Sequence, residues 1–289
     1  MRLLLFLALL INLFLLNSCK KYVPADAAFF IKPDPVSVAI TSSLQGSTSS
    51  KITDLWLYVN GKFQGAYPTG NLLPIISKGE RVKISILAGI KKNGISDTRT
   101  SWIFYDYLTI DTTVESGKTF TRPITFRYNP NTTFAWMENF DGQGFTLVKS
   151  IGDVNGNGNS DATWTLCPTS EAFEGNSAMM DMTGMQNGAT GQVESAISYT
   201  LPLASANVFL EVNFKGNQGF EVGVISGTTT KSTLFVNPSP NWNKIYISLA
   251  DVINKTPNST AQKIYFKMVK TAENPNPVMY LDNIKVIYL

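Results

Sequence analysis

The sequence predicts an all-β protein made of two successive domains. In one segment after another, apolar residues occupy every second position, which is the period of a strand with one buried face. Glycine, asparagine and proline separate these segments, and no stretch keeps the 3.6-residue period of an amphipathic helix. Only 16% of the residues are charged, whereas Asn, Ser, Thr and Gly are plentiful, a composition that suits an exported β-protein with weakly charged surfaces.

A first domain is predicted at residues 28–129. The segment 52–59 alternates, and Asn60-Gly61 after it supplies the two positive-φ positions of a type I′ hairpin turn. About seven short strands in roughly 100 residues is the size of an immunoglobulin-like β-sandwich. The strands are expected at residues 29–32, 52–59, 62–67, 81–90, 102–110 and 119–128.

A second domain is predicted at residues 132–289, because Asn129-Pro130-Asn131 interrupts the alternation. Strands are expected at residues 134–140, 193–201, 207–215, 220–225, 231–236, 242–248, 263–269 and 278–289. The Gly/Asn/Ser-rich segments 152–161 and 184–191 are expected to be loops, and 250–255 a single helical turn.

Three motifs of this second domain resemble a galactose-binding-like jelly roll, the fold of many carbohydrate-binding modules. Glu138-Asn139-Phe140-Asp141 opens the domain, the segment 242–249 lies late in it, and the segment 280–286 closes it. The resemblance covers residues 132–289 and implies a jelly-roll β-sandwich that binds a polysaccharide or other glycan. Such modules often hold a structural calcium near their first and last strands, which makes Glu138, Asp141 and Asp282 candidate ligands.

The N-terminus resembles a bacterial lipoprotein signal peptide. Met1-Arg2 is followed by the apolar run 3–16, interrupted by Asn12, and then by Leu16-Asn17-Ser18-Cys19, which matches a lipobox. A helix over this run would be about 21 Å long, too short for the roughly 30 Å of hydrocarbon in a bilayer. The resemblance implies removal of residues 1–18, acylation of Cys19 and a lipidated tether over 19–27.

The predicted lipid anchor is consistent with the two predicted domains. A lipobox followed by a β-sandwich and a jelly roll resembles surface lipoproteins of Bacteroidetes-type bacteria. We therefore expect an outer-membrane lipoprotein of the cell envelope, held to the lipid bilayer by its acylated cysteine. Whether it faces the periplasm or the cell surface is left open.

Composition excludes several function classes. One of the 24 basic residues lies in 1–18, so 23 basic and 21 acidic residues remain, a net charge of +2 without the basic stripe of a nucleic-acid-binding protein. The absence of histidine excludes Ser-His-Asp and Cys-His catalysis and the usual zinc sites. With Cys19 acylated, Cys167 has no disulfide partner and is expected to be a buried, inert thiol. Chemistry by a pair of carboxylates remains open.

A calcium loop is one candidate site. Asp153, Asn155, Asn157 and Asp161 place oxygen side chains at positions 1, 3, 5 and 9 of such a loop, with Gly158 at position 6 for the tight bend. Asn159 lies among these candidate ligands. Position 12, where a bidentate glutamate belongs, is Trp164, so any calcium would be structural and weakly bound. The alternative is a Gly/Asn-rich loop without an ion.

Aromatic side chains are the other candidates, because their faces stack on the apolar face of a sugar. Trp164, Trp136 and Tyr199 lie in the second domain, and Trp164 is the preferred exposed platform; the alternative for each is a place in the core. We expect a lipid-anchored, non-catalytic glycan-binding protein of the cell envelope. The alternatives are a structural or docking subunit that binds other envelope proteins, and a carboxylate-based polysaccharide-degrading enzyme.

Overall fold

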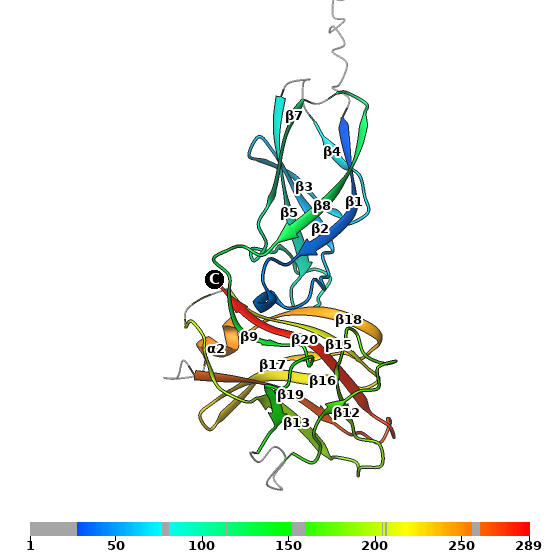
Figure 1. Cartoon of the computed structure of the whole chain (residues 1–289), viewed down its shortest axis with the longest axis vertical. Coiled ribbons are helices and arrows are strands. Elements are labelled where there is room, and N and C mark those ends of the chain that lie inside the picture. Colours follow the sequence, from blue (N-terminus) through cyan, green and yellow to red (C-terminus); the bar gives the residue numbers. More distant parts are fainter. Residues whose placement is uncertain are drawn as a thin grey trace, which may run out of the picture.

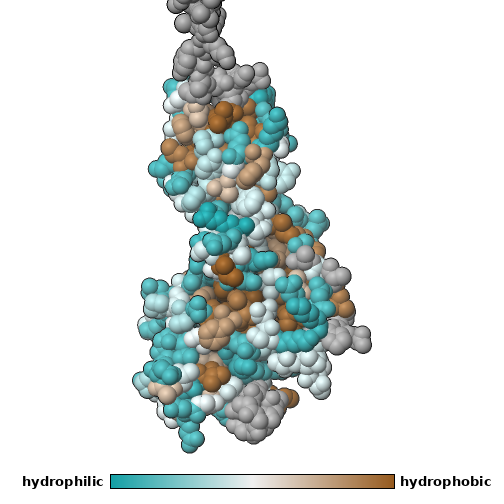
Figure 2. Space-filling model, turned by 180° about the vertical axis from the view of Figure 1, so that it is seen from behind, coloured by the Kyte–Doolittle hydropathy of each residue, from teal (hydrophilic) through white to brown (hydrophobic). Residues whose placement is uncertain are grey.

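The computed structural model describes residues 28–76, 81–113, 115–151, 160–203, 205, 207–255 and 261–289. The leader, Cys19, the tether to residue 27 and the proposed calcium ligands up to Asn159 lie outside these residues. The described chain forms two β-rich domains placed end to end, as Figure 1 shows. Seen from behind, the molecule narrows where the domains meet (Figure 2).

The N-terminal domain is a sandwich of two sheets. The first sheet has the order β4-β1-β8, and the second has the order β3-β2-β5-β6 with β7 also paired to β5. Asn60 and Gly61 have φ angles of 50° and 77°, so they form the predicted hairpin turn between β2 and β3. The strands are β1 (Phe29–Ala39), β2 (Asp54–Val59), β3 (Lys62–Pro68), β4 (Leu73–Ile75), β5 (Arg81–Lys91), β6 (Arg99–Ser101), β7 (Leu108–Thr113) and β8 (Thr119–Arg127).

One predicted strand of this domain, at 102–110, is wrong. Only its end, from Leu108, belongs to a strand. Trp102 is buried, and its ring lies 4.9 Å from Phe209 and 4.7 Å from Tyr246 of the second domain. Burying these large aromatic side chains between the domains therefore outweighs the strand propensity of the segment.

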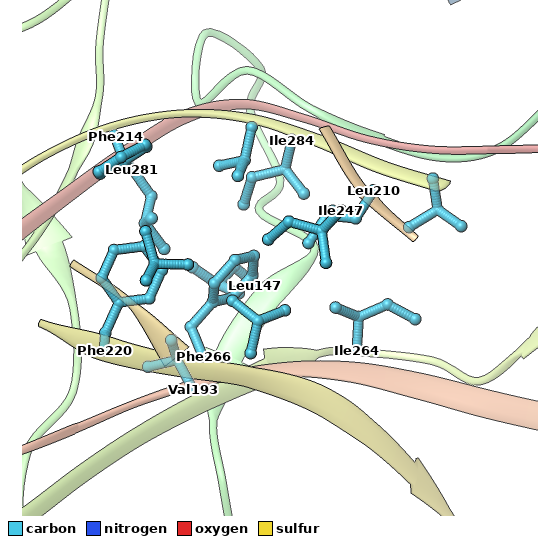
Figure 3. Packing of buried hydrophobic residues seen from close by; sticks show 14 of the residues in the cluster. Leu147, Val193, Leu210, Phe214, Phe220, Ile247, Ile264, Phe266, Leu281 and Ile284 are labelled. Carbon is cyan, nitrogen blue, oxygen red and sulfur yellow. The ribbon is translucent and has the colours of Figure 1, made fainter. Parts of the chain in front are cut away.

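The C-terminal domain is the predicted jelly-roll sandwich, and the all-β fold class is confirmed. One sheet, here called the outer sheet, has the order β10-β13-β19-β16-β17, with β14 paired to β19. The other, here called the domain-facing sheet, has the order β11-β12-β20-β15-β18, with β9 paired to β20. Leu210, Ile247 and Ile284 of the domain-facing sheet meet Val193 and Phe266 of the outer sheet in the core (Figure 3).

These two sheets contain twelve strands, and one short helix, α2 (Ala250–Asn254), follows β18. The strands are β9 (Thr133–Glu138), β10 (Leu147–Lys149), β11 (Thr165–Leu166), β12 (Ala178–Asp181), β13 (Thr190–Ser195), β14 (Tyr199–Thr200), β15 (Val208–Gly216), β16 (Phe220–Ser226), β17 (Thr229–Val236), β18 (Ser239–Ser248), β19 (Ala261–Val269) and β20 (Val278–Tyr288). Cys167 is a buried free thiol, as predicted. Within the described ranges, no helix is long and apolar enough to cross a membrane.

The N-terminal domain packs on the domain-facing sheet. Lys285 Nζ donates to the Ser47 carbonyl oxygen at 2.9 Å, and Lys244 Nζ donates to the Ser49 carbonyl oxygen at 2.6 Å. The outer sheet lies on the other side of the jelly-roll core, so its outward face is turned away from the N-terminal domain (Figure 1).

Candidate ligand-binding groove

Polar side chains gather on the outward face of the outer sheet, where β13, β19 and β16 lie side by side. Gln192 pairs with Lys267, which pairs with Glu221, to give one row across the three strands. The next row contains Glu194 and Tyr265. Successive side chains of a strand point to opposite faces, so the residues between these rows point into the core. Those residues are Val193, Phe266 and Val222, all fully buried.

Glu194 is the centre of the first hydrogen-bond network. Its Oε1 lies 2.7 Å from Lys263 Nζ, and its Oε2 accepts a hydrogen bond of 2.6 Å from Ser150 Oγ. Ser150 Oγ in turn accepts a hydrogen bond of 3.0 Å from Gln192 Nε2. Gln192 and Glu194 are only 4% and 6% exposed, so both side chains are held in place.

Tyr265 and Glu221 form a second network. The Tyr265 hydroxyl donates to Glu221 Oε1 at 2.5 Å, and Lys267 Nζ lies 3.0 Å from the same oxygen. Burial, and then the hydrogen bond to Glu221, raise the pKa of Tyr265 far above its ordinary value, so the hydroxyl stays a donor. A Cβ on Gly223 would lie 2.6 Å from the Tyr265 ring, so only glycine leaves room for the ring.

These networks border a groove of about 710 Å³. Ile151 and Ile225 add apolar surface, and three hydroxyl-bearing side chains complete its polar part. The groove therefore offers cationic donors, a carboxylate, an amide and small apolar patches, which together suit a polyhydroxylated ligand. The lining residues are Ile151, Gln192, Glu194, Ser198, Ile225, Gly227, Thr228, Thr230, Lys263 and Lys267.

The predicted aromatic residues lie outside the groove lining. Trp136 is 2% exposed, its Nε1 donates to Thr146 Oγ1 at 2.8 Å, and its ring stacks on Tyr199 at 5.9 Å. Trp136 is thus part of the core rather than an exposed platform, and ligand binding by it stays a prediction. Tyr199 is half-buried, and burial raises its pKa to about 12.

Trp164 is half-buried rather than an open platform. Its ring lies 5.3 Å from Phe140 and 5.0 Å from Phe145, and its Nε1 donates to the Leu147 carbonyl oxygen at 2.8 Å. Ligand binding by Trp164 and Tyr199 stays a prediction.

In the second set of candidate calcium ligands, each carboxylate accepts hydrogen bonds from other groups of the protein. Glu138 accepts hydrogen bonds from Phe140 N and Thr146, and Asp141 accepts one from Asn176 N. In the part of the chain that the structure describes, no three acidic, Cys or His side chains are close enough to hold a metal ion. Calcium binding by Glu138, Asp141 and Asp282 stays a prediction.

Asp282 also has donors of its own. Its Oδ2 accepts a hydrogen bond of 2.7 Å from Ser177 Oγ, and burial raises its pKa to about 6. Of the loop candidates, only Asp161 is described, and its Oδ2 accepts a hydrogen bond from Thr190 N at 2.7 Å. The calcium loop at 153–161 stays a prediction.

The groove residues were not predicted from the sequence. A signal was present, because polar residues alternate with apolar ones at 190–195 and again at 263–268. Which strands are neighbours, however, depends on the topology of the sheet, and alternation alone does not give it.

Comparison with known proteins gives only distant structural similarity. No family model and no curated protein matches the chain. A family 11 carbohydrate-binding module from Clostridium thermocellum, in complex with a β-1,3-1,4-mixed-linked tetrasaccharide, is 14% identical, with 54% of this chain and 94% of that chain covered and a TM-score of 0.37. The K3 cleaved adhesin domain of Lys-gingipain from Porphyromonas gingivalis is 11% identical, with coverages of 54% and 99% and a TM-score of 0.37.

A third solved structure, TmCBM61 in complex with β-1,4-galactotriose, is 14% identical, with coverages of 45% and 90% and a TM-score of 0.30. Similarity at this level identifies neither a family nor a ligand for the chain.

Proposed function

We propose that this protein binds a glycan in the groove of the outer sheet, without catalysis, as a lipid-anchored protein of the cell envelope. The observation that carries the proposal is the pair Gln192 and Glu194, which are almost fully buried on the outward face of a sheet and joined through Ser150. Polar groups fixed in this way lose little side-chain entropy when they bind a ligand. Sugar hydroxyls both donate and accept hydrogen bonds, so they match the mixed donors and acceptors of this groove.

The non-catalytic part of the proposal rests on the partners of the two carboxylates. Glycoside hydrolysis needs one carboxyl group that delivers a proton to the glycosidic oxygen. Glu194 accepts hydrogen bonds from an ammonium and from a serine hydroxyl. Glu221 accepts them from Tyr265 and from Lys267. Neither carboxylate is placed to donate a proton, so we assign both to holding the groove.

The anchor would be acylated Cys19 in the outer membrane. β1 begins at the end of the N-terminal domain that lies farthest from the C-terminal domain (Figure 1). The outward face of the outer sheet is turned away from the N-terminal domain. A tether leading into β1 would therefore leave the groove on the side of the molecule opposite the membrane.

The test is binding of the full chain, purified in mild detergent, to a broad glycan array with added calcium and with a chelator. We expect selective binding to one class of glycan. Binding that persists in the chelator would show that the groove binds glycan without calcium. An array with no selective signal under either condition would contradict the proposal and favour the docking-subunit alternative.

A further inference from the structure

The two lysines of the groove have unused hydrogen-bonding capacity. A lysine ammonium carries three N–H donors. Among the described residues, the only acceptor recorded for Lys263 Nζ is Glu194 Oε1, and the only one recorded for Lys267 Nζ is Glu221 Oε1. Within the described ranges, two donors on each ammonium thus have no protein acceptor, and the two side chains are 26% and 24% exposed, so solvent reaches them.

The hydrogen-bond acceptors of the groove have fewer free sites than its ammonium donors. Both oxygens of Glu194 already accept a hydrogen bond, one from Lys263 and one from Ser150. Glu221, which accepts from Tyr265 and Lys267, is not among the residues that line the groove. The lining thus carries two positive charges and one negative charge, and Glu221, which pairs with Lys267 from outside the lining, balances the second lysine. The lining itself therefore offers more cationic donors than anionic acceptors.

A lining with surplus cationic donors favours a ligand that brings anionic acceptors. Hydrogen bonds between an ammonium and an anionic oxygen are roughly twice as strong as those between neutral groups. Lys263 and Lys267 lie four residues apart on β19, on either side of Tyr265, so about 13 Å separates their Cα atoms. The two lysines can therefore contact an extended glycan at two separate points.

We infer that the ligand is an acidic glycan, whose carboxylate or sulfate oxygens bind the ammonium groups of Lys263 and Lys267. This inference rests on the proposed function, because it names the substrate class of the same groove. Glu194 lines the groove and pairs with Lys263, whereas Glu221 pairs with Lys267 from outside the lining. Both carboxylates hold the lysines on the sheet, and they oppose an anion that comes close to them.

The test compares pairs of ligands that differ only in charge. The full chain in mild detergent is titrated with oligogalacturonate and with its methyl ester, and with dextran sulfate and unmodified dextran. We expect binding of an anionic member that weakens about tenfold or more when the charge is removed, and that falls as salt rises. The first pair identifies a carboxylate ligand, and the second identifies a sulfate ligand.

Variants connect this preference to the groove. Lys263→Met and Lys267→Met are each expected to weaken anion binding about tenfold, and Lys267→Arg, which keeps the charge, to retain most of it. Lys215→Met is the matched control, because Lys215 is also paired with a glutamate, Glu171, but on the domain-facing sheet.

Two outcomes would overturn the inference in distinguishable ways. Equal binding of the charged and uncharged members, or selective binding of neutral glycans only, contradicts the acidic ligand and leaves glycan binding in place. A chain that binds no glycan in these titrations or on the array contradicts both.

Discussion

Lys244 Nζ lies 2.8 Å from Glu211 Oε2 in the interface between the two domains, where the side chains are 3% and 0% exposed. Tyr128 of the N-terminal domain donates to the same carboxylate at 3.1 Å. A second ammonium, that of Lys285, lies 3.3 Å from the Tyr128 hydroxyl. The contact between the domains is thus built around one buried carboxylate and two buried lysines.

The charge of Lys285 predicts how stability depends on pH. Burial, and then the nearby ammonium of Lys244, lower the pKa of Lys285 from 10.5 to about 7. Between these two values the unfolded chain binds the proton and the folded chain does not, so the free energy of unfolding should rise with pH across this window. Its slope should be at most about 1.4 kcal/mol per pH unit from this group. Urea unfolding from pH 7 to pH 10 measures it.

Lys285→Met removes this titration and should flatten the rise, whereas Lys149→Met, at an exposed position, should leave it unchanged. A Lys285→Met chain whose unfolding keeps the slope of the parent would show that another group is responsible.

The buried ion pair predicts a large cost for removing its carboxylate. Glu211→Ala leaves the Lys244 ammonium buried without an opposite charge, which should lower the free energy of unfolding by about 3–5 kcal/mol. Glu171→Ala, which breaks the more exposed pair with Lys215, should cost about 1 kcal/mol or less. Denaturant unfolding of both variants checks this, and equal losses would contradict the central role of Glu211.

Part of the fold follows directly from the sequence, because the signals are local. Asn60-Gly61 turns where it was expected to, since few other residue pairs adopt two positive φ angles. Alternation located most of β5, where Val82, Ile84 and Ile86 are all buried. The short strands β4, β10, β11 and β12 were not predicted, because two to four residues are too few to show a period.

The groove could not be predicted, because it depends on contacts between distant segments. Gln192 and Lys267 are neighbours only after β13 and β19 have paired. The same limit explains Trp136, whose aromatic ring fits a sugar platform and a core position equally well until its surroundings are known.

The close packing at Gly223 predicts an effect on both stability and binding. An added Cβ would lie 2.2 Å from the Lys231 carbonyl oxygen and 2.6 Å from the Tyr265 ring. Gly223→Ala should therefore lower the free energy of unfolding by about 1–3 kcal/mol and displace Tyr265 from Glu221, with weaker glycan binding.

Thermal melting and ligand titration of this variant test the prediction. Gly144→Ala is the control, since nothing lies within 4 Å of its added Cβ. If Gly223→Ala melts and binds as the parent does, the Tyr265 ring is not fixed in the way the structure shows.

The proposed lipobox predicts a covalent modification. Cys19→Ser should abolish incorporation of a labelled fatty acid and release the protein from the membrane fraction. Cys167→Ser should change neither, because that thiol is buried in the C-terminal domain. Fractionation of labelled cells measures both, and an acyl label that persists in Cys19→Ser would contradict the proposed anchor.

The central claim is that the groove of the outer sheet binds a glycan, and Gln192 gives its most direct test. Gln192→Leu keeps the size of the side chain but removes an uncharged amide from the groove lining. By calorimetry with the strongest ligand from the array, the affinity of Gln192→Leu should be about tenfold lower than that of the parent. Gln143→Leu, at an exposed position outside the groove lining, should bind as the parent does. Equal affinities of Gln192→Leu and the parent would contradict the claim and place the ligand elsewhere on the molecule.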